Sequence, residues 1–323
     1  MKFLLTGGAG FIGSHIADKL LLEDHHVTVI DNLSTGLKSN IEHNLNNSNF
    51  LFIKADIGDT QKLSELIANN DCIIHLACAV GVKYVLENKL RSLNSNILNT
   101  ISVVQHAATH NKKIVFFSSS EIYGKNNEEL RENSDRIIGS SFRWNYSIGK
   151  SVGEYYLKAY GEQSNLQYIT LRCFNIVGSR QLSNYGMFLP RLVKQALSEE
   201  PMTVYDSGQQ VRSFTDIDDL KNILYLLLFN QSSWGKTINL GSKNSISIQK
   251  LAEKIKKKTG SVSDIIHTPS KLVYGEDFED IEIRVPDNNE LVKLVGNYKF
   301  SDIDTIIEKC IRWSKENKVT LNT

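Results

Sequence analysis

The chain has 323 residues, of which 41% are hydrophobic and 23% charged, with only 4 prolines. This length and apolar content exclude a single small module and a disordered chain, and they predict a large globular protein with a sizeable core. Lys and Arg together number 37 and Asp and Glu 36, a formal net charge of +1. The chain therefore lacks the broad basic field that binds nucleic acid or an anionic membrane surface.

Cysteine usage and hydropathy favour a cytoplasmic protein without metal. The cysteines form no CxxC pair and no metal-ligand spacing, so we expect reduced thiols; they are Cys72, Cys78, Cys173 and Cys310. The apolar N-terminal run is interrupted by glycines and shows no cleavage-site pattern. No stretch approaches the roughly 18 apolar residues of a membrane-spanning helix. We expect neither a membrane nor a nucleic-acid partner.

In the first half of the chain, short apolar runs alternate with longer helical patterns. Strands are expected at 2–6, 27–31, 50–56, 72–77, 113–119 and 168–174, and crossover helices at 11–23, 60–70, 94–110 and 144–164. Because these strands are apolar at consecutive positions, both faces of the sheet should be covered. The pattern predicts an α/β fold of the Rossmann type with a doubly wound parallel sheet.

The regular alternation weakens after residue 178. Helices are expected near 187–198, 217–229, 247–259 and 302–317, and TINLGS at 237–242 is typical of one more strand. We therefore predict a dinucleotide-binding Rossmann domain over 1–178. Residues 179–323 should form mainly a smaller α/β substrate lobe, partly interleaved with the first domain because the strand near 237–242 returns to the sheet.

The first expected strand leads directly into TGGAGFIG and then a helix, which places Gly7, Gly10 and Gly13 in the turn between them. Glycines there permit a tight turn and close backbone approach, and free N–H groups at the helix start can meet a pyrophosphate. Asp31 ends the next strand, where a carboxylate can accept hydrogen bonds from ribose hydroxyls and repel a 2′-phosphate. The combination predicts NAD rather than NADP.

Asp56 and Ile57 follow the third expected strand. The carboxylate could receive the exocyclic amine of adenine while the isoleucine packs on the ring. A helix N-cap region explains these two residues nearly as well.

The fifth expected strand ends in SSSEIYG, and YSIGK follows with Tyr146 and Lys150. Four residues apart on a helix, their side chains share one face, so the ammonium should lie near the phenol and lower its pKa. Tyr146 could then accept a proton from an alcohol whose carbon gives hydride to the nicotinamide, with Ser119 holding the same oxygen. An ordinary amphipathic helix is the alternative for YxxxK alone.

The sequence resembles the extended short-chain dehydrogenase/reductase family of NAD-dependent nucleotide-sugar epimerases, dehydratases and decarboxylases. The resemblance covers essentially the whole chain and rests on TGGAGFIG, DNLSTG at 31–36, HLA at 75–77, the serines at 118–120, YSIGK, FNIVGSRQ at 174–181, VYDSGQQVRSFTDIDD at 204–219 and TINLGS. It implies a UDP-sugar substrate and a homodimer formed through helices near 94–110 and 144–164. It implies cofactor contacts from Gly7, Gly10, Phe11, Ile12, Gly13, Asp31, Asn32, Gly36, Asp56, Ile57, Leu76, Ala77, Asn96, Tyr146 and Lys150.

The resemblance also implies that Asn175 and Arg212 help hold the substrate diphosphate, a group to which a bidentate guanidinium is suited. A surface ion pair is the alternative for Arg212. In FNIVGSRQ the usual proline before the arginine is missing, which leaves the role of Arg180 open.

A narrower resemblance is to bacterial UDP-glucuronate decarboxylases, and related UDP-sugar 4-epimerases share the same stretches. It rests on SSSEIYG, RWNYSIGK at 143–150, AYGEQ at 159–163 and YGEDFEDIEIRVPD at 274–287, with serine at 119 where many members carry threonine. It implies site roles for Ser119, Ser120, Glu121, Tyr146, Lys150 and Arg284. Arg284 would approach either the C6 carboxylate or the diphosphate, or else form an ion pair within its own acidic stretch, which we expect to be solvated.

Decarboxylation is our first expectation, 4-epimerisation the second and dehydration the third. All three begin with oxidation at C4. Glu121 follows Ser119 by two residues, so on an extended segment both side chains would face the same sugar. Ser120 occupies the position where dehydratases carry an acidic residue. A catalytically silent NAD-binding sensor is the competing class, against which the intact Ser119, Tyr146 and Lys150 argue.

Overall fold

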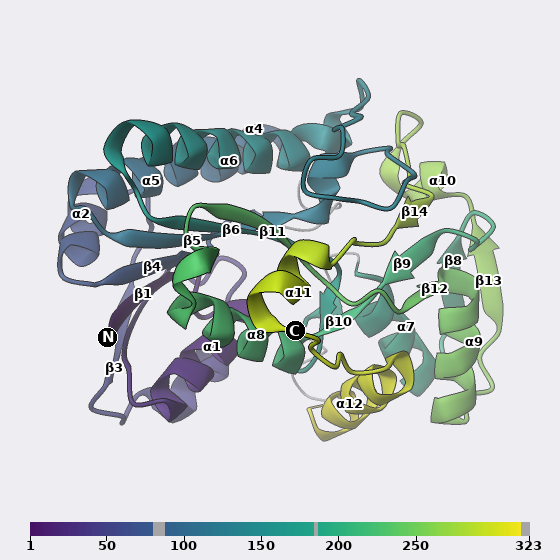
Figure 1. Cartoon of the computed structure of the whole chain (residues 1–323). Coiled ribbons are helices and arrows are strands. Elements are labelled where there is room, and N and C mark those ends of the chain that lie inside the picture. Colours follow the sequence, from purple (N-terminus) through teal and green to yellow (C-terminus); the bar gives the residue numbers. More distant parts are fainter. Residues whose placement is uncertain (80–87, 184–186, 318–323) are drawn as a thin grey trace.

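A seven-stranded parallel sheet forms the centre of this computed structural model, which describes residues 1–79, 88–183 and 187–317 (Figure 1). The strand order is β11-β6-β5-β4-β1-β2-β3, and every neighbouring pair is parallel. The strands are β1 Lys2–Thr6, β2 His26–Asp31, β3 Phe50–Lys54, β4 Cys72–His75, β5 Lys113–Ser119, β6 Tyr168–Cys173 and β11 Lys236–Leu240. The order confirms the expected doubly wound Rossmann sheet.

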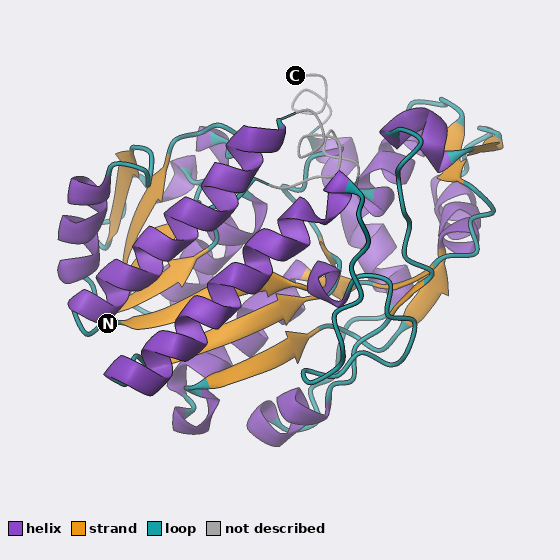
Figure 2. Cartoon of the chain, turned by 90° about the horizontal axis from the view of Figure 1, so that it is seen from above, coloured by secondary structure: helices purple, strands orange, loops and turns teal. Residues whose placement is uncertain are grey.

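Helices cover both faces of the sheet, and two long helical segments lie across its strands in the view from above (Figure 2). One face carries α2 Thr60–Ala68, α4 Lys89–Asn94, a π-helical turn Ser95–Asn99, α5 Thr100–Thr109 and α6 Asn145–Ser164. The opposite face carries α1 Phe11–Leu22, α8 Ile217–Phe229 and α11 Asn289–Val295. This double coverage explains the consecutive apolar positions of β5, where Ile114, Val115, Phe116 and Phe117 are all buried.

A smaller lobe lies beyond the carboxyl ends of the strands (Figures 1 and 2). Its small sheets are β8 Met202–Tyr205 with β13 Ile265–Thr268, β12 Ser245–Ser247 with β9 Val211–Ser213 and β14 Ile283–Arg284, and β7 Ile176–Val177 with β10 Thr215–Asp216. Its helices are α7 Phe188–Leu197, α9 Ile248–Thr259, α10 Ser270–Tyr274 and α12 Ile303–Glu316. The lobe has its own apolar core, to which α7, α9 and α12 contribute Leu192, Leu251 and Ile307.

The two halves of the chain are interleaved, because three segments after residue 178 return to the central sheet. β11 pairs with β6 at its edge. α8 packs beside α1, so that Ile223 and Leu224 share a core with Ile16 and Leu20. Leu291 of α11 belongs to the same core. Among the described helices, none has the length and apolar character needed to cross a membrane.

Candidate active site

A cavity of about 840 Å³ opens at the carboxyl ends of the strands, between the sheet and the smaller lobe. Ligands of open α/β sheets bind at this edge, where strand order reverses on either side of β1. Most residues expected at the site line the cavity: Gly7, Gly10, Phe11, Ile12, Gly13, Asp31, Asn32, Asp56, Ile57, Leu76, Ala77, Ser119, Ser120, Glu121, Tyr146, Lys150, Asn175 and Arg284. Gly36, Asn96 and Arg212 do not belong to this lining.

The turn between β1 and α1 can be formed only with glycine at its key positions. Gly7 has a φ of +72°, and a Cβ atom there would lie 2.8 Å from the Ala77 nitrogen. A Cβ on Gly13 would lie 2.6 Å from the Gly7 carbonyl oxygen, so α1 packs directly on the turn. The first N–H groups of α1 therefore face the cavity edge, where they can meet a pyrophosphate.

Asp31 ends β2, and its carboxylate is fixed by two backbone amides. Ala9 N–H donates to Oδ2 at 3.0 Å and Leu33 N–H donates to Oδ1 at 2.8 Å. Burial raises the pKa of Asp31, and the two amide hydrogen bonds oppose that rise. Each carboxylate oxygen can accept a further hydrogen bond, so ribose hydroxyls fit here. Gly36 keeps this position open, because a Cβ on Gly36 would lie 2.9 Å from Asp31 Oδ2.

Three further expected cofactor residues, Asn32, Asp56 and Asn96, bond to each other or to the backbone. Asn32 Nδ2 donates to Asp56 Oδ2 at 2.7 Å, and the other oxygen of Asp56 accepts from Gly58 N–H. Asn96 is 1% exposed and pairs with the backbone of Ala79 through both its amide oxygen and its amide nitrogen. Its visible role is to hold the segment after β4 against the π-helical turn.

Tyr146 and Lys150 lie on the first turns of α6, and their side chains meet as the helical spacing predicts. Lys150 is 2% exposed, and its Nζ lies 5.7 Å from the centroid of the Tyr146 ring and 4.9 Å from that of Phe116. Ser119, at the end of β5, forms a hydrogen bond with Tyr146. A serine hydroxyl, a phenol and an ammonium thus surround one part of the cavity.

The predicted lowering of the Tyr146 pKa is wrong for the protein alone. Burial raises this pKa well above 10, and the neighbouring Cys78 and Glu121 raise it further, while the hydrogen bond with Ser119 works in the opposite direction. Lys150 does not outweigh these effects. Tyr146 is therefore a neutral phenol until additional positive charge reaches its ring.

Glu121 lies on a 3₁₀ turn, Ser120–Tyr123, and not on the extended segment that the sequence analysis assumed. β5 ends at Ser119, whose Oγ accepts a hydrogen bond from Glu121 N–H at 3.2 Å. The side chains of Ser119 and Glu121 both line the cavity because the chain turns there, not because they alternate along a strand.

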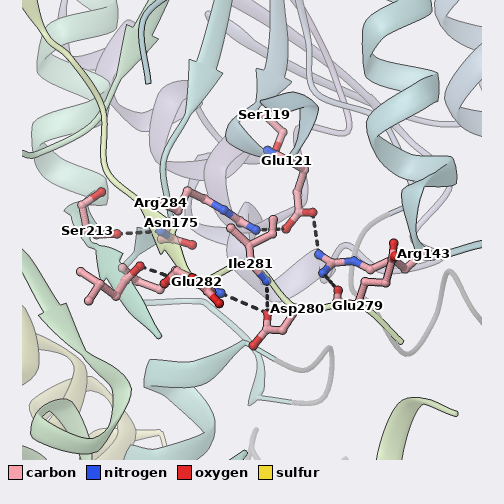
Figure 3. Close-up of polar contacts among 12 residues, drawn as sticks. Ser119, Glu121, Arg143, Asn175, Ser213, Glu279, Asp280, Ile281, Glu282 and Arg284 are labelled. Carbon is pink, nitrogen blue, oxygen red and sulfur yellow. Dashed lines mark hydrogen bonds and ion pairs between the residues drawn. The ribbon is translucent and has the colours of Figure 1, made fainter. Parts of the chain in front are cut away.

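The Glu121 carboxylate lies between two guanidinium groups (Figure 3). Arg284 Nη2 is 2.6 Å from Oε1, and Arg143 Nη2 is 2.8 Å from Oε2. Burial alone would raise the pKa of Glu121, but Arg284 and Arg143 lower it to about 2. The carboxylate is therefore ionised at neutral pH, and this end of the cavity keeps one excess positive charge.

Arg143 is the site residue that the sequence analysis missed. It belongs to the 3₁₀ turn Phe142–Trp144 just before α6 and is 7% exposed. The available signal was its position in RWNYSIGK, three residues before Tyr146. That spacing brings two side chains to the same side of a helical turn.

Arg212 and the acidic stretch near 280 pair with each other. Arg212 donates to the carbonyls of Val211 and Glu282 and forms an ion pair with Asp280 at 3.1 Å. Burial and the nearby Arg284 lower its pKa to about 10. Glu279 is bound by Lys125 and by the indole N–H of Trp144. The expectation of a solvated acidic run is therefore wrong for Glu279 and Asp280.

Asn175 lines the cavity and donates from Nδ2 to the Ser213 carbonyl at 2.7 Å, with a left-handed φ of +36°. Among residues 1–79, 88–183 and 187–317, no group of three His, Cys, Asp or Glu side chains could hold a metal ion. His75 is fully buried between the hydroxyls of Thr6 and Thr100, and burial lowers its pKa to about 3.

Comparisons with known proteins agree with this geometry. Residues 3–241 match the model of the NAD dependent epimerase/dehydratase family. A UDP-N-acetyl-alpha-D-glucosaminuronate decarboxylase of Bacillus cytotoxicus is 35% identical over 98% of both chains. UDP-glucuronic acid decarboxylase 1 of Xenopus tropicalis is 33% identical over 98% of this chain and 72% of its own. The structure of UDP-glucuronic acid 4-epimerase from Bacillus cereus, bound to UDP-glucuronic acid and NAD, superposes with a TM-score of 0.88 at 28% identity, covering 98% and 99% of the two chains. With a glycine turn and an Asp31 that fit its cofactor, this chain belongs to the NAD dependent epimerase/dehydratase family.

Proposed function

We propose that the protein decarboxylates a UDP-hexuronic acid by oxidising C4 to a transient ketone and then reducing the product. The observation that carries this proposal is the pairing of Arg284 and Arg143 around Glu121, next to Ser119 and Tyr146. The excess positive charge there suits a sugar with a carboxylate at C6, whereas a neutral sugar would leave it uncompensated.

The side chains of this chain have separable roles in that reaction. Ser119 donates a hydrogen bond to the C4 oxygen, and Tyr146 accepts the proton of the C4 hydroxyl. Lys150 stabilises the phenolate, together with any further cation near the ring. When bound, NAD supplies the hydride acceptor for C4 and returns the same hydride at the end.

A ketone at C4 turns the C6 carboxylate into that of a β-keto acid. Breaking the C5–C6 bond then leaves its electron pair on the enolate, and carbon dioxide departs. A proton from solvent at C5 restores a ketone, and Tyr146 returns its proton to the C4 oxygen as this ketone is reduced to the alcohol. The ionised Glu121 faces the carboxylate that is lost, so departure of carbon dioxide removes a like-charge contact.

Two features favour decarboxylation over dehydration. Ser120 offers no acid to a leaving hydroxyl. Glu121, with a pKa of about 2, holds no proton to donate at neutral pH. The 35% identity with the Bacillus cytotoxicus decarboxylase along the whole chain supports the same choice. Epimerisation at C4 is the second candidate, because the Bacillus cereus 4-epimerase is similar over nearly the whole chain.

The test is a time course of the NAD-loaded protein with UDP-glucuronate and UDP-N-acetylglucosaminuronate, each labelled with ¹³C at C6. Proton NMR reports inversion at C4, and carbon NMR reports released bicarbonate. Label release with formation of a UDP-pentose supports the proposal. Inversion with retained label would establish the epimerase instead. Tight NAD binding without turnover of either sugar, or of UDP-glucose, would indicate an NAD-binding sensor.

We also propose that Asn175 contacts the diphosphate, since it lines the cavity at the lobe side. The proposed assembly is a homodimer through the π-helical turn Ser95–Asn99, α5 and α6, where the exposed apolar side chains include Leu98, Ile148 and Tyr155. Light scattering of Tyr155→Glu tests that interface, and a mass unchanged from the parent dimer would contradict it. A cytoplasmic location is proposed from the four free thiols and is tested by fractionation.

A further inference from the structure

Arg143 stands at the junction of three parts of the site. Its turn, Phe142–Trp144, leads directly into α6, which carries Tyr146 and Lys150. Its side chain lines the cavity and is bonded to Glu121 (Figure 3). The same guanidinium donates to the carbonyl of Glu279, in the segment that leads to Arg284.

The two arginines that share Glu121 are held very differently. The Arg143 guanidinium lies between two rings, 4.4 Å from the Trp144 centroid and 5.1 Å from that of Phe278, and it also bonds to Glu279. Among the described residues, Glu121 is the only side chain bonded to Arg284. A competing carboxylate would therefore displace Glu121 from Arg284 more easily than from Arg143.

Both arginines retain an unused donor. The Nε atoms of Arg143 and Arg284 are buried and have no hydrogen-bond partner in the described part of the chain, although each residue is 7% exposed. A buried donor without a partner costs free energy, which an incoming oxygen would recover. Two guanidinium groups on either side of one carboxylate, both in the lining of the cavity, favour an anionic ligand at this end of it.

We propose that Arg143 is a positioning residue that holds Glu121 in place, so that Arg284 can exchange Glu121 for the C6 carboxylate of the substrate. This inference rests on the proposed function, because it assigns the sugar end of that same cavity. Other charged or titratable groups that act on Glu121 are Arg212 from β9 and Tyr146 from α6. Without Arg143, Glu121 would keep Arg284 as its main counter-charge, and the substrate carboxylate would lose its partner.

The experiment compares Arg143→Met, Arg143→Lys and the matched control Lys125→Met, all loaded with NADH so that UDP-glucuronate binds without being turned over. Lys125 binds Glu279 at 2.9 Å and so supports the same segment without touching Glu121. Calorimetry measures the affinity for UDP-glucuronate and for UDP-glucose, which lacks the carboxylate. We expect Arg143→Met to weaken the affinity for UDP-glucuronate by about tenfold or more and the affinity for UDP-glucose by less than about twofold. Arg143→Lys should recover most of this loss, and Lys125→Met should change neither affinity.

The pH profile gives a second measure that a merely structural role would not move. Removing one of two cations beside Glu121 should shift the acid limb of the kcat/KM profile of Arg143→Met to higher pH.

An equal loss of affinity for both sugars, or no loss of affinity for UDP-glucuronate, would overturn the proposal. Binding needs no turnover, so a parent protein that binds UDP-glucuronate through Arg143 without decarboxylating it would refute the proposed function alone. If Arg143→Met fails to fold, the same two sugar affinities are compared between Arg143→Lys and Arg284→Lys.

Discussion

Replacing Glu121 by glutamine should reveal how strongly the carboxylate is bound between its two arginines. The substitution keeps the size of the side chain and removes its charge. Arg284 and Arg143 lower the pKa of Glu121 from 4.5 to about 2 against the opposing effect of burial. A shift of this size corresponds to about 3 kcal/mol. We therefore expect Glu121→Gln to lower the free energy of unfolding by about 3 kcal/mol at pH 7.

The pH dependence of this loss distinguishes an ion pair from a packing effect. Because the folded pKa is the lower one, the stabilisation is fully present above the unfolded pKa of about 4.5 and is lost as pH falls toward about 2. At pH 3.5 about 1 kcal/mol of it should be gone. The difference between parent and variant should thus be constant from pH 7 to pH 5 and smaller at pH 3.5.

Urea titrations of both proteins at these three pH values measure the difference directly, since other titrating groups cancel at each pH. A difference that is the same at pH 3.5 and pH 7 would refute the paired, ionised Glu121. Rapid mixing with UDP-glucuronate adds a functional readout at 340 nm. We expect Glu121→Gln still to reduce NAD, with slower return of the absorbance to baseline. Absence of the initial reduction would show that Glu121 acts before the carbon–carbon bond breaks.

Three further substitutions test the remaining parts of the site. Tyr146→Phe should lower kcat by about 10²- to 10⁴-fold, while the NAD affinity and the circular dichroism spectrum stay unchanged. A turnover rate near that of the parent would show that Tyr146 is not the proton acceptor. Asp31→Asn should weaken the affinity for NAD by about tenfold, because a charge-assisted hydrogen bond to ribose becomes a neutral one. The affinity for NADP should fall less. Fluorescence titration measures both affinities, and equal losses would contradict the ribose assignment. Gly13→Ala should lower the free energy of unfolding by about 1–3 kcal/mol and weaken NAD binding, because the new Cβ would lie 2.6 Å from the Gly7 oxygen. Unfolding curves measure this loss, and an unchanged free energy of unfolding would show that the turn accommodates the methyl group.

Local patterns predicted the nucleotide end of the molecule well. The Gly7–Gly13 turn and Asp31 depend on one strand–turn–helix unit and the end of the next strand, and such short-range signals are visible in a linear sequence. The crossover helices and the parallel sheet follow from apolar periodicity in the same way. Tyr146 and Lys150 meet because a single helix fixes their spacing.

The charged end of the site could not be predicted in this way. Glu121 is bound by Arg143 and by Arg284, which belong to distant parts of the chain and are brought together only by tertiary folding. The turn at Ser120 replaced an assumed extended segment, so the stated reason for the convergence of Ser119 and Glu121 was wrong. The direction of the Tyr146 pKa shift was also mistaken, because burial, which outweighs Lys150, depends on the whole fold.

The late arrival of β11 at the sheet constrains how this protein is synthesised. β6 is complete when Cys173 has been made, but its outer edge stays unpaired until Lys236–Leu240 leave the ribosome. During that interval the nascent chain presents an open strand edge and the apolar face that α8 will cover, both of which favour association with other chains. A message truncated after codon 178 should accordingly yield an aggregating product, and chaperone demand should peak before residue 240 emerges.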